Sequence, residues 1–167
     1  CNNASSCSTP SFSNSSNVTS SPAEKIEVAA ARLAWTRDAS TNMEVCSSLQ
    51  ALQGFARGEG AWTGLHRGKR IEQLDRIVDL VEELYPSLRW FLFDGLQRYA
   101  APVTVFGPIR AVLYLGQMYM VLTSAEHVRE MTRHFDDHIR AAVVQPPDVP
   151  DKVRALRREI ARSATVD

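Results

Sequence analysis

The apolar residues of this chain change their spacing at Pro86, and that change limits the folds open to it. Before Pro86 they recur every three or four residues, which places them on one face of a helix. After it, apolar and aromatic residues form short runs as far as residue 122, which is typical of strands. Helical spacing then returns. This order predicts an α+β fold, with an N-terminal helical module followed by a small, mostly antiparallel sheet packed with helices.

The expected helices are defined by their apolar stripes and their stop signals. Helical patterns cover residues 23–34, 35–55, 69–84, 126–142 and 153–160. Thr123 and Glu126 have the spacing of a capping box at the start of the fourth helix. Pro146, Pro147 and Pro150 predict a stiff linker before the last helix, which is short and basic.

The expected strands lie between Pro86 and the capping box. They cover residues 88–93, 103–106, 111–115 and 118–123. Gly116 and Gln117 predict a tight hairpin turn between the last two. The apolar run from residue 111 to 122 is nearly continuous, so both faces of the sheet are expected to be largely covered.

Composition divides the chain into segments. Residues 1–22 are rich in Ser and Asn and carry no charge, and such a segment cannot bury enough apolar surface to fold, so it is predicted to be a disordered tail. Residues 23–64 form the helical module. Residues 65–145 are interpreted as an α+β dimerisation or sensing module, and residues 146–167 as the Pro-rich linker and basic helix.

Charge and hydropathy exclude some general functions. The 19 basic and 19 acidic residues cancel, so no overall field attracts the chain to nucleic acid or to an anionic membrane. No apolar run approaches the roughly 18 to 20 residues that a membrane helix needs. Three cysteines are too few and too unevenly spaced for a disulfide framework, and Cys46 lies in an apolar-periodic stretch, where it is expected to be a small buried hydrophobe.

The first residue allows an alternative localisation. Cys1 followed by a Ser/Asn-rich linker resembles a mature bacterial lipoprotein with the lipid on that cysteine. The chain is otherwise expected to be cytoplasmic. Both interpretations stay open from the sequence.

Residues 31–60 have the spacing of a DNA-binding motif. Trp35, Thr36 and Arg37 are similar to the opening of its second helix, and residues 51–58 are similar to the end of its recognition helix. The segment therefore resembles a degenerate helix-turn-helix of the phage-repressor type. The turn lacks the usual glycine, and Arg37 replaces the usual Gln. The resemblance implies that the recognition helix begins near Ser47 and Ser48.

The resemblance implies a transcriptional regulator that binds double-stranded DNA. Short polar side chains on the recognition helix would contact bases in the major groove, and these are Ser47, Ser48 and Gln50. Cations beyond the helix would contact phosphates without reading sequence, and these are Arg57, Arg67, Lys69 and Arg70. A module that follows a helix-turn-helix commonly dimerises or senses a ligand, so a homo-oligomer is expected. The basic run at residues 66–70 could equally be the solvated start of a helix.

Three histidines fall on one stripe of the expected helix 126–142. They are His127, His134 and His138, and two histidines four residues apart can share a metal ion. The stripe also borders the apolar face, where histidines are often boundary residues, so no metal site and no cofactor are predicted. The sequence holds no nucleophile elbow, phosphate loop or Cys-x-x-C motif, and Asp94 before Gly95 is read as turn chemistry.

The sequence thus favours a small, non-enzymatic DNA-binding regulator. The alternative is a non-enzymatic protein-interaction or structural subunit, anchored by lipid at Cys1, whose helical module has no role with DNA.

Overall fold

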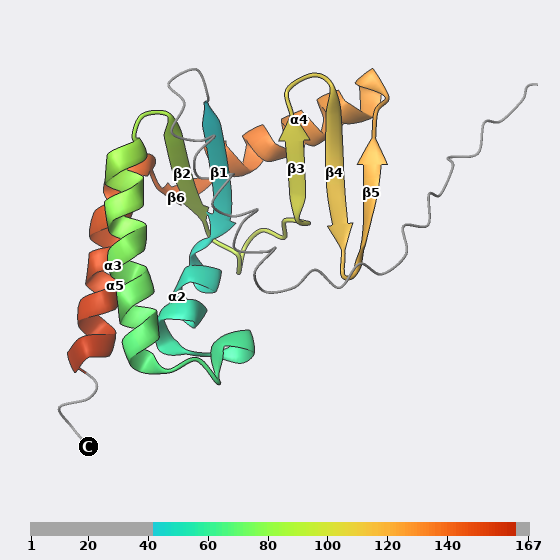
Figure 1. Cartoon of the computed structure of the whole chain (residues 1–167). Coiled ribbons are helices and arrows are strands. Elements are labelled where there is room, and N and C mark those ends of the chain that lie inside the picture. The colour runs from blue at the N-terminus through green and yellow to red at the C-terminus, as the bar shows by residue number, and fades with distance from the viewer. Residues whose placement is uncertain (1–41, 163–167) are drawn as a thin grey trace, which may run out of the picture. The chain divides into compact units, whose positions relative to one another are not determined.

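A computed structural model of the chain describes residues 42–162, which form four α-helices and two three-stranded sheets (Figure 1). The predicted α+β class is confirmed. The predicted tail, the first helix and the opening of the helix-turn-helix resemblance lie outside the described residues, as does Cys1. No helix within the described range is both long and apolar enough to cross a lipid bilayer.

The first sheet is built around strand β2 (Leu88–Phe93), which lies between β1 (Met43–Ser48) and β6 (Ala142–Val144). β1 runs parallel to β2, with Cys46 opposite Phe91, and β6 runs antiparallel to β2. A parallel pair needs a long crossover connection. The chain supplies it with helix α2 (Leu49–Arg57), the short helix η1 (Gly60–Trp62) and helix α3 (Arg67–Leu84).

The second sheet is an antiparallel meander. β3 (Val103–Phe106) pairs with β4 (Arg110–Leu115), and β4 pairs with β5 (Met118–Leu122). Gly116 has a φ of 66°, in the left-handed region that a two-residue hairpin turn requires, so the predicted turn is confirmed. β5 forms one edge of this sheet.

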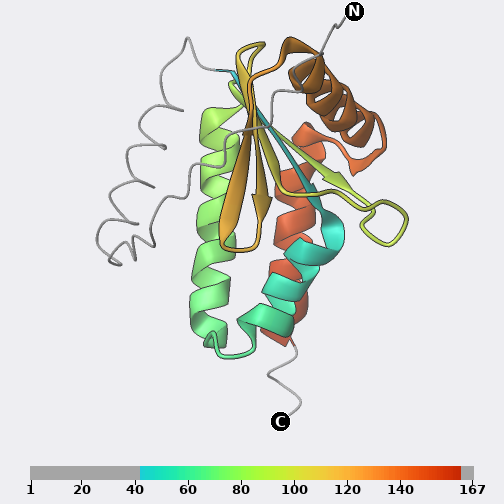
Figure 2. The same cartoon turned by 90° about the vertical axis from the view of Figure 1, so that its right-hand side faces the viewer.

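The main core lies between the first sheet and three helices. α3 and α5 (Val149–Arg162) run side by side, as Figure 2 shows, and α2 packs against both. The buried cluster combines residues from all of these elements: Leu52, Ala56, Leu74, Val78, Leu92, Val149, Val153, Leu156 and Ile160. Because this core joins residues 49–57, 67–84 and 149–162, the predicted boundaries at 64/65 and 145/146 do not separate packing units.

Helix α4 (Ala125–Arg140) links the two sheets. It packs against β1 and β2 of the first sheet and against β3 and β4 of the second (Figure 1). Val128 and His138 are the buried residues of α4. The ring of Phe93 on β2 meets the His138 ring edge-on, with the ring centroids 4.9 Å apart. The position of α4 therefore fixes the pocket described below.

The structure corrects the expected helix at residues 35–55. Residues 43–48 are a strand, and the helix begins only at Leu49. Val45 and Cys46 pair with β2, and Ser48 caps the following helix by accepting a hydrogen bond from the Ala51 amide at 3.1 Å. Tertiary pairing with an aromatic strand overrides the local helical spacing.

Two expectations about the C-terminal half are also corrected. The proline segment is not a linker, because residues 146–148 form a short helix and Pro150 lies in the first turn of α5, where the lack of an N–H costs little. Pro146 and Pro150 are buried. The expected capping box is absent as well, since α4 begins after Ser124 and no side chain caps it.

The expectation that the second sheet is covered on both faces is wrong. Four consecutive residues of β5 are exposed, namely Met118, Tyr119, Met120 and Val121. A continuous run of apolar residues indicates that burial of these side chains would be favourable. It does not indicate which part of the chain, or which partner, would bury them.

Gly58, the residue that caps the C-terminal end of α2, and Gly54 inside the helix provide a test of how this helix ends. Gly58 has a φ of 74°, and a Cβ there would lie 2.5 Å from the guanidinium Nη1 of Arg70. Gly58→Ala should therefore lower the free energy of unfolding by about 1–3 kcal/mol. Gly54 lies inside the same helix with nothing within 4 Å of such a Cβ, so Gly54→Ala should raise it by about 0.5–1 kcal/mol.

The measurement is urea unfolding of the two variants beside the unsubstituted protein. Equal effects of the two substitutions would contradict the left-handed cap and the packing of Arg70 beneath it.

Candidate functional site

The three residues predicted to contact bases all hold the fold together. The Ser47 hydroxyl accepts a hydrogen bond from Trp90 Nε1 at 2.8 Å, and the Ser48 hydroxyl is the α2 cap. The Gln50 amide donates to Asp94 Oδ1 at 2.8 Å and accepts from the Gly95 amide at 2.7 Å. Ser47 and Gln50 thus bond to β2 and to the loop that follows it, and Ser48 bonds to α2.

The four predicted phosphate contacts lie where the ends of α2 and α5 meet the start of α3. Arg67 donates to the carbonyls of Ile160 and Ala161, each at 2.8 Å, and Arg70 donates to the carbonyl of Ala56 at 2.7 Å. Both guanidinium groups therefore bind the negative C-terminal ends of helices.

The other two cations form exposed ion pairs. Arg57 contacts Glu159 at 3.1 Å, and Lys69 contacts Glu72 at 2.8 Å. The hydrogen bond that Lys69 donates to Glu72, together with the negative charge of Glu72, raises the pKa of Lys69. These two remain on the surface, whereas Arg67 and Arg70 are partly buried.

The seven predicted residues thus form two groups and not one surface. Ser47, Ser48 and Gln50 lie at the start of α2, and the four cations lie at its other end. A nine-residue helix is about 13 Å long. No helix presents the three polar residues together with the cations, as the resemblance would require.

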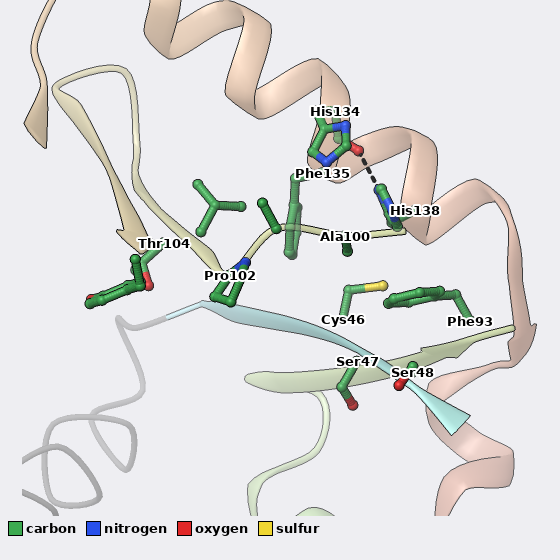
Figure 3. Close-up of a pocket in the computed structure, with 13 residues that line it drawn as sticks. Cys46, Ser47, Ser48, Phe93, Ala100, Pro102, Thr104, His134, Phe135 and His138 are labelled. Atoms are coloured by element: carbon green, nitrogen blue, oxygen red, sulfur yellow. Dashed lines mark hydrogen bonds between the residues drawn. The ribbon is translucent and has the colours of Figure 1, made fainter. Parts of the chain in front are cut away.

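A pocket of about 300 Å³ lies where β1, β3 and α4 approach one another (Figure 3). β1 contributes Cys46, Ser47 and Ser48, and the loop before β3 contributes residues 100–102. Figure 3 shows His134, Phe135 and His138 of α4 on the opposite side of the pocket, and the Cys46 thiol pointing toward Phe93. The remaining lining residues are Val103, Thr104 and Tyr114.

The loop between β2 and β3 is anchored at both ends. Near its start, Asp94 Oδ1 accepts hydrogen bonds from Gln50 and from the Leu96 amide, which confirms the predicted turn chemistry. A Cβ on Gly95 would lie 2.8 Å from that of Ser48, so only glycine fits there. Near its end, the Tyr99 carbonyl lies 3.2 Å from His138 Nε2. These contacts hold one wall of the pocket in place.

The histidine stripe divides into three different environments. His138 is buried, and its Nδ1 lies 2.8 Å from the His134 carbonyl. A neutral imidazole donates from only one of its nitrogens, so in that form His138 bonds either this carbonyl or that of Tyr99. His134 is half-buried at the pocket, and its ring meets that of His138 edge-on at 4.5 Å; His127 is exposed. Between residues 42 and 162, no group of three His, Cys, Asp or Glu side chains is placed to hold a metal ion.

Cys46 is a half-buried thiol at the pocket wall. Burial raises its pKa from 9.0 to about 11. The thiolate is the nucleophilic form of cysteine, so this environment suppresses its reactivity at neutral pH. The Cys46 position is thus suited to packing against a neighbour and not to covalent chemistry.

The second sheet exposes an apolar surface that we call the hairpin surface. Its residues lie on β5, on the end of β4 and around the β3–β4 turn: Phe106, Ile109, Tyr114, Leu115, Met118, Tyr119, Met120 and Val121. Each is between 40% and 74% exposed. Monomeric proteins rarely expose large contiguous apolar patches, and successive side chains of β5 divide these residues between the two faces of the sheet.

The sequence predicts dimerisation or sensing within residues 65–145, which contain the hairpin surface, but it does not indicate the pocket. Residues 111–122 contain no charged residue and so lack the protection usual for an edge strand. The pocket left no such signal, since its lining comes from β1, a loop and α4, which are far apart in the chain.

Comparison with known proteins adds no functional information. No protein-family model, curated protein or solved structure matches the chain.

The reactivity of Cys46 tests the pocket wall. In a Cys1→Ser/Cys7→Ser background, the rate of alkylation by iodoacetamide should rise with a midpoint near pH 11, because only the thiolate reacts. Burial of the protonated thiol contributes stability that is fully present below pH 9.0 and is lost as the pH rises toward 11, so circular dichroism must follow folding in parallel.

The same protein unfolded in urea is the control, with an expected midpoint near 9.0. A folded-state midpoint at or below that value would mean that the thiol is open to solvent.

Proposed function

We propose that residues 42–162 are the self-association module of a small, non-enzymatic regulatory protein, and that two copies join through β5. The observation that carries this proposal is the exposed, uncharged edge of the second sheet. β5 hydrogen-bonds to β4 on one side, and within the described part of the chain no strand pairs with its other side. The free amides and carbonyls there are a template for another strand.

A second copy is the partner that fits the charge of this region. Arg110 is the only charged residue between residues 103 and 122, and its guanidinium lies 4.9 Å from the centre of the Phe106 ring. Two identical uncharged edges meet without like-charge repulsion. A charged partner would meet no opposite charge on β5.

The area is also adequate for a dimer. If a large side chain carries about 200 Å² of surface, the exposed fractions of the hairpin surface sum to roughly 800 Å² per copy. Standard protein interfaces bury about 800 Å² per partner. The part of this surface nearest β5 and the backbone of the paired strands would form the interface.

The pairing has one natural register. Two β5 strands related by a two-fold axis run antiparallel, as closed dimers require. With the axis at Met120, this residue faces its own copy, and Tyr119 faces Val121. The two meanders then form one six-stranded sheet.

Opposite charges at Met120 test this register. Met120→Lys should weaken self-association by at least about tenfold, because two ammonium groups would face each other across the axis. Met120→Glu should do the same. An equimolar mixture of the two variants should restore the dimer, since Lys then faces Glu. Sedimentation velocity over a range of concentrations measures all three.

Val143→Lys is the matched control. Val143 is also an exposed apolar residue on an edge strand, but it lies on β6 of the other sheet. This variant should associate like the unsubstituted protein. A protein that is monomeric at all concentrations, or a mixture that does not recover, would remove β5 from the account.

DNA binding is a second candidate, and the observation that favours it is the convergence of four cations at one end of the helical layer. Arg57 and Lys69 are exposed there, while Arg67 and Arg70 bind helix ends. Groove contacts by Ser47, Ser48 and Gln50 are not part of this candidate, because their polar atoms are used within the fold.

This candidate is tested by titrating the full chain with mixed-sequence duplex DNA at low and moderate salt. Binding should weaken steeply with salt, and Arg57→Glu/Lys69→Glu should weaken it and flatten the salt dependence. Arg133→Glu is the control, since Arg133 forms a similar exposed pair with Glu130 on α4. Absence of binding at low salt would leave self-association as the function.

The same module would serve a protein anchored through Cys1, which lies outside the described residues. The intact mass of the native protein distinguishes the two settings, because a diacylglyceryl group on Cys1 would place it at a membrane, away from chromosomal DNA.

A further inference from the structure

The pocket between β1, β3 and α4 has an unusual composition for this chain. None of its 13 lining residues is charged, although charged residues make up 23% of the sequence. Three aromatic rings line it, those of Phe93, Tyr114 and Phe135. A charged ligand would lose its hydration there without meeting an Asp, Glu, Lys or Arg side chain of opposite charge.

The pocket nevertheless contains hydrogen-bonding groups that are not used elsewhere. Within residues 42–162, neither ring nitrogen of His134 has a hydrogen-bond partner, and the same holds for the hydroxyls of Thr104 and Tyr114. The neighbouring His138 differs, because both of its ring nitrogens face carbonyls. His134 is thus the imidazole that can serve a ligand, and it projects from α4 toward the pocket (Figure 3).

The loop that forms one wall of the pocket is held by hydrogen bonds near both of its ends. Gln50 fixes the start of the β2–β3 loop, and the Tyr99 carbonyl lies beside His138 near its end. A wall fixed in this way does not have to be ordered when a ligand binds, which favours affinity.

From these features we propose that the pocket binds a small, uncharged aromatic molecule that carries one hydrogen-bonding group. The aromatic part lies among Phe93, Tyr114 and Phe135, and the polar group bonds His134. A volume of about 300 Å³ is at the lower end for ligand pockets and suits two fused rings. The pocket lies within a single copy, and Tyr114 is the residue that it shares with the hairpin surface.

Three matched compounds test this proposal with the full-length chain: 1-naphthol, naphthalene and 1-naphthoate. They share the fused rings and differ in whether they carry a neutral hydroxyl, no polar group or a negative charge. Chemical-shift changes in ¹H–¹⁵N spectra give each dissociation constant. 1-Naphthol should bind most tightly, with 1-naphthoate at least about tenfold weaker.

Two histidine variants separate ligand contact from structure. His134→Phe keeps a ring at the pocket but removes its nitrogens, so it should weaken 1-naphthol about three- to tenfold and leave naphthalene unchanged. His127→Phe makes the same substitution on the same helix outside the pocket and should change neither constant. Unaltered spectra outside the pocket check that both variants are folded.

A filled pocket gives the final control. Ala101→Trp should abolish binding of all the compounds, and Met120→Lys should leave it intact. The proposal is overturned if 1-naphthoate binds as tightly as 1-naphthol or if the Ala101→Trp variant still binds the compounds. It is also overturned if none of the three compounds binds at about 1 mM.

Discussion

The parallel pairing of β1 with β2 is the interaction on which the rest of the described fold depends. It forces the chain through a crossover made of α2 and α3, and these helices supply one side of the main core. It also places the end of β1 beside the end of β2, so Gln50 reaches Asp94 and Gly95. This pairing therefore holds in place both the loop after β2 and the Cys46 side of the pocket.

The sequence predicted those elements whose signal is local. The α3 stripe, the β4–β5 turn at Gly116 and the buried face of α5 follow from spacing and turn chemistry within a few residues. The helical spacing of residues 35–55 does not reveal β1, because that strand forms by pairing with a partner about 45 residues away. The prolines do not reveal that their segment is packed, because it lies against β2 as well as α5.

The candidate site was less predictable, since composition does not say which polar groups are already used. A basic run near a helix start is expected to meet solvent or phosphate, yet Arg67 and Arg70 bind the C-terminal carbonyls of other helices. Conversely, an uncharged apolar strand is expected to be covered, yet β5 is exposed. The cations are largely used within the fold and the apolar strand is exposed, and this contrast is the basis for proposing a protein partner ahead of nucleic acid.

The central claim is that β5 pairs with a second copy of itself, and amide hydrogen exchange measures this pairing directly. Those β5 amides that do not bond to β4 should become protected as the protein concentration rises through the dissociation constant, while the amides of β6 should not change. Fast exchange of the same β5 amides at every concentration would contradict the account, because a paired edge cannot leave its amides open to water.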